Sequence, residues 1–289
     1  MAKNRRKLLT GSIGLNLFAV LFTLMPIVTL GTWTYTIFLS DSRQTVALSA
    51  VQSDASPRLF EEPIISVTFD DGWESNYSVA APILSEYGIA STHYIIPGEF
   101  TRPIYISAEQ ALSLKNAGHE ISSHTYSHYN LTTISQEEVR EELDRSIEIL
   151  DKLSLLDDEN RTFAAPNGAL DNYSKSQVKQ RFALARNVNG DLATDISAND
   201  MNVRDGANRY DIIGYTVGQY TTYDQLKGAL AYAKAHNAWF VPVYHQIDDS
   251  GLEYSVSPVV FEEHMKLFRD SGFKIVTMRD VLLANQEKL

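Results

Sequence analysis

Short apolar runs alternate with amphipathic stretches from Pro63 to the end of the chain. Eight runs have the length and the apolar, β-branched or aromatic content of strands, and each is followed by glycine, proline or polar residues. They cover residues 64–69, 91–96, 119–123, 161–165, 182–186, 211–217, 239–245 and 274–278. Between them the pattern predicts helices, several of them opened by a capping residue such as Ser135, at residues 75–88, 107–118, 135–153, 221–237 and 257–272. This alternation predicts a parallel α/β sheet or barrel, in which polar motifs at the carboxyl ends of the strands carry the chemistry.

The first 60 residues follow another pattern. Four basic residues, at positions 3, 5, 6 and 7, precede an uncharged stretch over 8–40, and its apolar part at 17–39 is longer than the roughly 20 residues that cross a bilayer. Residues 1–40 are therefore predicted to form a cytoplasmic basic end and one transmembrane signal-anchor helix, 41–60 a linker, and 61–289 one extracytoplasmic domain. The rival interpretation is a cleaved signal peptide and a secreted form, because small residues at 47–50 resemble a cleavage site. A buried core helix would leave the flanking charge unexplained.

Composition narrows the classes of function. The chain has no cysteine, which excludes disulfides, thiolate zinc sites and a cysteine nucleophile, so any metal must be held by nitrogen and oxygen. All 36 acidic residues lie beyond the uncharged stretch and four of the 25 basic residues precede it, which leaves the predicted exported part near −15. Such a surface repels phosphate backbones, so nucleic acid is not expected as a partner.

Two polar motifs directly follow predicted strands. The first, Asp70-Asp71-Gly72, sets two carboxylates side by side, and two ionised neighbours need a cation or strong donors nearby. The second places His124 and His128 four residues apart, a spacing that on a helical turn brings both imidazoles to one metal ion. Each motif alone is also compatible with an ordinary turn or a chance pair. Together Asp71, His124 and His128 make a two-histidine, one-carboxylate set that leaves positions open for water and substrate.

Two further motifs follow later strands. Pro166-Asn167-Gly168 is a turn that can point backbone N–H groups into a pocket, as an oxyanion site requires, although a plain turn has the same sequence. His245 ends the apolar run 239–245 and is expected on the same face of the fold, although a single histidine at a strand end is often structural.

The ordered set resembles the polysaccharide deacetylase family, also called the NodB-homology domain or carbohydrate esterase family 4. The resemblance covers roughly residues 63–283 and rests on Thr68-Phe69-Asp70-Asp71-Gly72, on His124-Thr125-Tyr126-Ser127-His128 and on the strand that ends at His245. It implies a distorted (β/α) barrel with Asp70 as general base and His245 as general acid. It further implies that Asp71, His124 and His128 are ligands of one divalent metal ion.

The resemblance has gaps. The family's third motif carries arginine two residues before the proline, oriented towards the base, and this chain has Ala164 there. Arg161 lies nearby without matching that position, and the family's aspartate and tryptophan motif, which supports the acid histidine, has no match.

The implied activity is removal of acetyl groups from N-acetylated sugars of an extracytoplasmic polysaccharide, with the membrane as a second partner through the N-terminal helix. Zinc is the first expectation for two histidines and a carboxylate, and cobalt or nickel fits the same set. Two alternatives remain: an O-acetyl esterase acting on acetylated xylan or a similar glycan, and a catalytically silent glycan-binding module.

Overall fold

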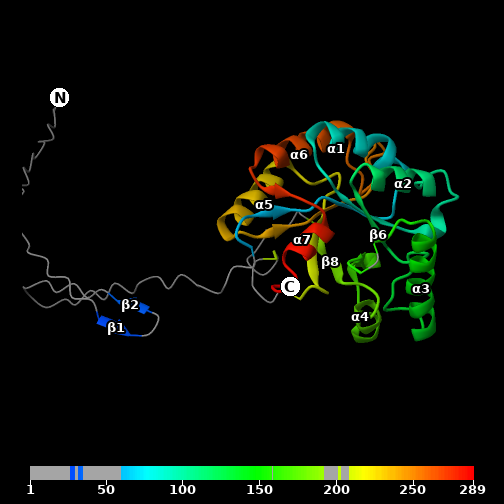
Figure 1. Ribbon diagram of the computed structural model, residues 1–289. Helices are drawn as coiled ribbons and strands as arrows, with labels where there is room; N and C mark the ends of the chain where they lie inside the picture. Colours follow the sequence, from blue (N-terminus) through cyan, green and yellow to red (C-terminus); the bar gives the residue numbers. More distant parts are fainter. Residues whose placement is uncertain (1–26, 30–31, 35–59, 158, 192–200, 203–207) are drawn as a thin grey trace, which may run out of the picture. The chain divides into compact units, whose positions relative to one another are not determined.

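The N-terminal region is described only in part. The computed structural model of the chain describes residues 27–29, 32–34, 60–157, 159–191, 201–202 and 208–289 (Figure 1). Within the predicted membrane helix, β1 (Ile27–Thr29) and β2 (Thr32–Thr34) pair as an antiparallel hairpin. Five of these six residues are β-branched, which favours strand over helix at these positions. The rest of the predicted helix and the linker up to residue 59 lie outside the described residues. No described helix is long and apolar enough to span a membrane.

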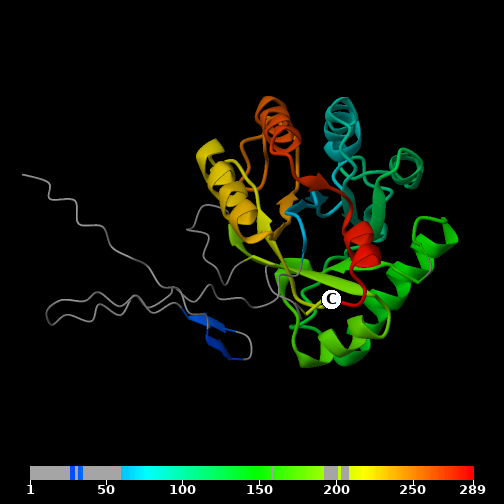
Figure 2. The ribbon, with the colours of Figure 1, turned by 60° about the vertical axis from the view of Figure 1, so that its left-hand side comes forward.

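The second compact unit, Ala55–Leu289, contains a closed barrel of parallel strands. Around the barrel lie β11 (Pro242–Tyr244), β4 (Thr68–Phe69), β5 (Thr92–Ile95), β6 (Glu120–Ser123), β7 (Thr162–Ala164), β8 (Leu184–Asp191) and β9 (Ile212–Thr216). Helices surround these strands on the outside (Figure 2). The predicted distorted (β/α) barrel is therefore confirmed, and its carboxyl end gathers the chain segments that follow β4, β6, β7 and β11.

Two of the predicted strands are each divided between two sheets. The run 64–69 gives β3 (Ile64–Ile65) before β4, and the run 239–245 gives β10 (Trp239–Phe240) before β11. The early halves join β12 (Lys274–Ile275) in a small parallel sheet of order β10-β3-β12, while the late halves pair with each other in the barrel. Because β4 and β11 are neighbours in the barrel, the residues that follow them emerge side by side.

The helices lie where the sequence predicted them, with two additions. A π-helical turn (Asn76–Ala80) leads into α1 (Ala81–Tyr87), followed by α2 (Ala108–Asn116), α3 (Gln136–Lys152), α5 (Tyr223–His236) and α6 (Pro258–Asp270). Ser135 caps α3 through the predicted reciprocal bonds with Glu138. The additions are α4 (Asn172–Lys179), which has only one buried apolar side chain, and α7 (Met278–Ala284), which begins where a strand was predicted to end.

Helix α7 closes the amino end of the barrel. Its first backbone N–H groups donate to side chains at the beginning of two barrel strands: Met278 to Thr92 Oγ1 and Arg279 to Glu120 Oε2. Its apolar side chains join a cluster that includes Trp239, fully buried beneath the barrel interior. The polar motifs lie at the opposite, carboxyl end of the barrel.

Candidate metal and catalytic centre

The turn after β4 sends two neighbouring carboxylates in different directions. The N–H of Asp70 continues the sheet by donating to the carbonyl of Tyr244 at 2.9 Å. Asp71 then takes a φ of 69° and Gly72 a φ of 73°, both in the left-handed region. A Cβ at Gly72 would lie 3.0 Å from Ile95 Cγ2, so glycine suits the position by both conformation and space. A non-glycine residue such as Asp71 rarely adopts this φ, and such backbone strain concentrates at functional sites.

The two histidines meet through an irregular loop. The sequence predicted one helical turn, which is wrong, because Thr125 and His128 have φ values of 65° and 64° that a right-handed helix excludes. The N–H of His128 instead donates to Thr125 Oγ1 at 3.0 Å, and that of Thr125 to Ser123 Oγ at 3.2 Å. These local bonds fold the loop so that the two imidazole rings lie 4.8 Å apart, between centroids.

Asp71, His124 and His128 form a compact group of potential metal ligands. Oδ1 of Asp71 lies 3.6 Å from Nε2 of His124 and 3.3 Å from Nε2 of His128. One ligand atom from each residue lies within 4.8 Å of the other two. Among the described residues Asp71 Oδ1 is buried without a hydrogen-bond partner, whereas Oδ2 accepts a bond from Trp73 Nε1 at 3.0 Å. The orphaned oxygen between two imidazole nitrogens fits a divalent cation, and the donor types suit zinc, cobalt or nickel.

His124 is prepared for this role. Burial is the largest effect on its pKa, which is lowered to about 4, so the ring is neutral at physiological pH. Its Nδ1 lies 2.8 Å from the carbonyl oxygen of Ala164, an acceptor, which assigns the ring proton to Nδ1. Nε2 is therefore left with its lone pair facing Asp71, the tautomer that a metal ligand needs.

Asp70 is held by an arginine that the sequence did not indicate. Asp70 is 3% exposed, and its Oδ1 accepts a hydrogen bond from Nη2 of Arg186 on β8. Oδ2 lies 3.8 Å from His124 Nε2, on the side of the ligand group. Burial raises the pKa of Asp70, but the guanidinium of Arg186 and, to a lesser extent, two nearby histidines outweigh it, so the pKa lies below its ordinary value. The carboxylate is thus ionised and has one oxygen available to accept a proton.

His245 follows β11, the strand next to β4, as predicted. It is one of the two histidines whose proximity lowers the pKa of Asp70. Its ring centroid lies 5.1 Å from that of Tyr254, and its Nδ1 is buried without a hydrogen-bond partner among the described residues. Asn76 fixes the backbone by donating from Nδ2 to the His245 carbonyl at 2.6 Å. The imidazole therefore stands beside the base without belonging to the ligand group.

The turn at Pro166–Gly168 lies after β7, at the same end of the barrel. Asn167 has a φ of 56°, and the N–H of Gly168 donates to the carbonyl of Ala165 at 3.0 Å. That N–H is used within the turn and is not available to an oxyanion. Of the turn Pro166-Asn167-Gly168, only the backbone N–H of Asn167 is left as a candidate donor to an oxyanion. That role stays a prediction.

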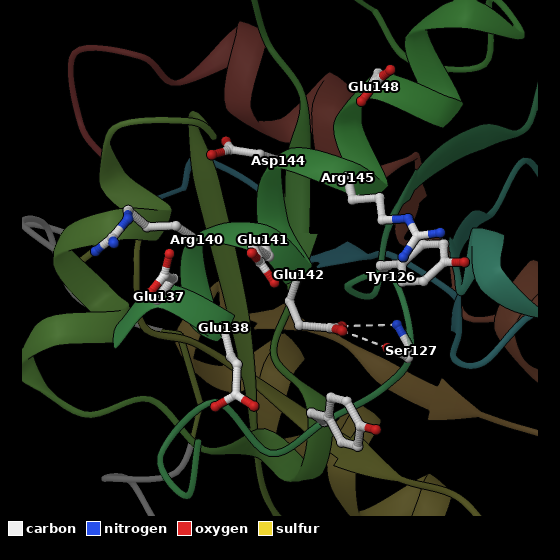
Figure 3. A pocket seen from close by; sticks show the side chains of 11 residues that line it. Tyr126, Ser127, Glu137, Glu138, Arg140, Glu141, Glu142, Asp144, Arg145 and Glu148 are labelled. Carbon is white, nitrogen blue, oxygen red and sulfur yellow. Dashed lines mark hydrogen bonds between the residues drawn. The ribbon is translucent and has the colours of Figure 1, made fainter. Parts of the chain in front are cut away.

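A groove of about 830 Å³ lies on the outer side of the histidine loop (Figure 3). Glu142 of α3 reaches across it to bind Ser127, accepting from its N–H at 2.8 Å and from its hydroxyl. Arg145 lies over the ring of Tyr126, 3.8 Å from its centroid. Helix α3 therefore holds the loop that carries His128 in place. The walls are otherwise rich in glutamate and contain no member of the ligand group.

Comparisons with known proteins agree with this architecture. Residues 59–182 match the family model described as polysaccharide deacetylase. A putative polysaccharide deacetylase of Bacillus subtilis is 29% identical over 92 residues, 32% of this chain and 33% of that protein. Chitin deacetylase 1 of Cryptococcus neoformans is 23% identical over 203 residues, 69% of this chain and 40% of that protein. The chain thus spans less than half the length of both relatives.

Solved structures show the same fold. The carbohydrate esterase family 4 domain of a multidomain xylanase from a termite hindgut metagenome (Trinervitermes trinervoides) superposes with a TM-score of 0.55 at 19% identity, covering 78% of this chain and 92% of that one. The family match over residues 59–182, the curated relatives and the shared fold together support a polysaccharide deacetylase domain of the carbohydrate esterase family 4 type in this chain. The matched residues 59–182 include Asp70, Asp71 and both histidines of the ligand group, and they end before Arg186 and His245.

Proposed function

We propose that this chain is a metal-dependent hydrolase that removes acetyl groups from N-acetylated sugars of a polysaccharide. The observation that carries the proposal is the arrangement around Asp70. One carboxylate oxygen is bonded to Arg186, and the other faces the ligand group at 3.8 Å from His124 Nε2. His245 directly follows β11, the strand next to β4. A base, a ligand set and a candidate acid thus converge at one barrel end, as amide hydrolysis requires.

Each side chain of the site has a separate role in the proposed reaction. A divalent ion held by Asp71, His124 and His128 would supply Lewis-acid polarisation of the acetyl carbonyl and acidify a water molecule. Asp70 accepts the proton of the attacking water through Oδ2, because Oδ1 is already bonded to Arg186. His245 donates a proton to the departing sugar amine, which as an anion is a very poor leaving group.

The names of the relatives support an N-acetylated polymer, because one is a chitin deacetylase. The test is acetate release by the purified full chain from N-acetylglucosamine oligomers, peptidoglycan and acetylated xylan, with Asp70→Asn as the inactive control. Release from the first two and not from xylan is expected. Release from xylan alone would favour the O-acetyl esterase, and binding without any release would favour a silent glycan-binding module.

The metal is part of the proposal. Purified protein should carry about one divalent ion, with zinc expected before cobalt or nickel. A His124→Ala, His128→Ala double variant should lose it, since two of three ligands are gone. His236→Ala, at an exposed position on α5, is the matched control and should retain the ion. Full occupancy in the double variant would overturn the ligand assignment.

We further propose that the uncharged N-terminal segment anchors the domain to a membrane, with the domain outside the cytoplasm. Support comes from the basic residues at positions 3–7 and the uncharged stretch that follows them. Protease added to intact cells should remove the domain and leave a short membrane fragment. Release of the whole domain without protease would favour cleavage after Ala50 instead.

A further inference from the structure

Arg186 is a fully buried cation in the barrel wall. Its side chain is 0% exposed and lies 5.2 Å from the centroid of the Tyr94 ring. Burying a guanidinium costs several kcal/mol unless it is paired and hydrogen-bonded. Its ion-pair partner is Asp70, reached by Nη2, whereas Nε and Nη1 have no hydrogen-bond partner among the described residues. Among the described residues, the side chain that forms a hydrogen-bonded ion pair with this buried guanidinium is therefore the candidate base.

Arg186 lies directly beside Ala164. The two residues are partners in the parallel pairing of β7 with β8. Phe163 and Ala185, one position earlier on each strand, pack together in the cluster between the barrel and α3 and α4. Because side chains alternate along a strand, Ala164 and Arg186 share the opposite, interior face. Because the side chain of Ala164 is only a methyl group, this part of the interior has room for the long side chain of Arg186.

The next strand also makes room for the arginine. A Cβ at Gly214 of β9 would lie 2.6 Å from Arg186 Cδ and 2.7 Å from Val243 Cγ2. Real Cβ atoms do not approach so closely, so any larger residue at this position would displace the arginine or the valine. The neighbours on both sides of Arg186 are thus small where its side chain passes.

We propose that Arg186 is the positioning residue for Asp70 and replaces, from the neighbouring strand, the arginine that the resemblance places at Ala164. It fixes Oδ1 and thereby turns Oδ2 towards the ligand group. It also offsets the repulsion between the adjacent carboxylates of Asp70 and Asp71. This inference rests on the proposed function and extends it to a residue beyond the part of the chain that matches the family model.

The first test removes the arginine at position 186 and then places one at position 164. Arg186→Met should lower kcat about 10²-fold with KM and metal content nearly unchanged, because the base loses its orientation and not its substrate. Arg186→Lys, which keeps the charge without the planar fork, should retain more activity. The decisive variant is Ala164→Arg combined with Arg186→Ala, which should recover at least tenfold over Arg186→Ala alone.

Arg181→Met is the matched control, because Arg181 also pairs with a carboxylate, Asp144, but on the surface. It should leave kcat within about twofold of wild type. A wild-type kcat in Arg186→Met would overturn the inference. It is also overturned if Arg186→Lys and the exchanged pair both fold normally by circular dichroism, yet Arg186→Lys does not exceed Arg186→Met and the exchanged pair does not exceed Arg186→Ala.

A second test does not depend on activity. Unfolding of metal-free wild type, Arg186→Met, Asp70→Asn and the double variant gives a double-mutant cycle. The double variant should be more stable than the sum of the two single losses predicts, since neither charge is left buried alone. Additive losses would overturn the pairing. If the wild type releases no acetate from any polymer, the proposed function fails. The double-mutant cycle still shows whether Arg186 and Asp70 stabilise each other.

Discussion

The indole Nε1 of Trp73 donates a 3.0 Å hydrogen bond to Oδ2 of Asp71. The same indole stacks on Tyr105, with 4.8 Å between ring centroids, so its plane is fixed from the other side. Oδ1 is consequently the oxygen turned to the two histidines. Trp73 therefore orients a ligand of the proposed metal, a task that its place one residue after the Asp-Asp-Gly turn does not reveal.

Trp73→Phe should weaken metal binding about 10-fold, because it removes the donor to Asp71 and keeps an aromatic ring against Tyr105. A competition titration with a chromogenic chelator measures the change. Trp239→Phe is the matched control, since its Nε1 donates to Ser66 Oγ far from the ligands. It should cost stability and leave metal affinity unaltered. Equal metal affinity in Trp73→Phe and wild type would show that the indole does not orient Asp71.

Replacing Asp70 or Asp71 by asparagine should have different effects on turnover and on metal affinity. Asp70→Asn should keep the metal and lose about 10² to 10⁴-fold in turnover, because an amide cannot act as general base. Asp71→Asn should mainly lower metal affinity, because Oδ1 is the ligand atom nearest both histidines. Metal analysis and kcat are measured on the same preparations. Identical metal loss in both variants would contradict the division of roles.

His245→Ala should cost far more on an N-acetyl sugar than on an activated aryl acetate. The amine must be protonated as it leaves, whereas a phenolate leaves unaided. Metal content should not change, because His245 is outside the ligand group. An equal loss on both substrates would indicate that His245 shapes the pocket, and the acid would then have to be sought on another strand.

Gly214→Ala tests the space that Arg186 occupies. Its new methyl group would fall 2.6 Å from Arg186 Cδ, so unfolding should become easier by about 1–3 kcal/mol and kcat should fall with it. Gly228→Ala is the control, in α5 with no neighbouring atom within 4 Å of its added Cβ. It should be neutral or stabilising by up to about 1 kcal/mol. Matching behaviour of the two variants in denaturant unfolding would show that β9 tolerates a side chain there.

His264 gives a pH dependence away from the centre. Burial lowers its pKa from 6.5 to about 4, so below pH 6.5 the unfolded chain binds a proton that the folded chain does not. As the pH is lowered from 6.5 to about 4, this residue should therefore lower the free energy of unfolding by about 1 kcal/mol per pH unit. Below about pH 4 its contribution should no longer change. Metal-free His264→Gln should show a shallower slope than wild type. The control His236→Gln, at an exposed position, should keep the wild-type slope.

The alternation of apolar runs predicted a parallel α/β sheet or barrel, and the family resemblance narrowed this to a barrel. Four segments of the site could be predicted because each motif directly follows an apolar run. The same local signals could not show the conformation of the histidine loop, because positive φ values at Thr125 and His128 depend on bonds to Ser123, Thr125 and Glu142. The membrane helix stays a prediction.

Arg186 was missed for another reason. An arginine inside an apolar strand is a signal of a buried partner, but its partner is 116 residues away, and only the pairing of β7 with β8 places it beside Ala164. The pairing of Ala164 with Arg186 across two strands cannot be predicted from residue spacing or from a sequence motif.

The pairing of β4 with β11 also constrains the order of folding. Asp70 is tied to Tyr244 by a backbone bond, and Asn76 to His245, across about 170 residues of chain. Contacts between such distant segments form late, because the intervening loop must first be closed at a large entropic cost. A nascent chain that has completed only β4 to β9 holds the ligand residues without the acid. The site is therefore expected to be complete only when β11, far along the chain from β4, has been inserted into the barrel.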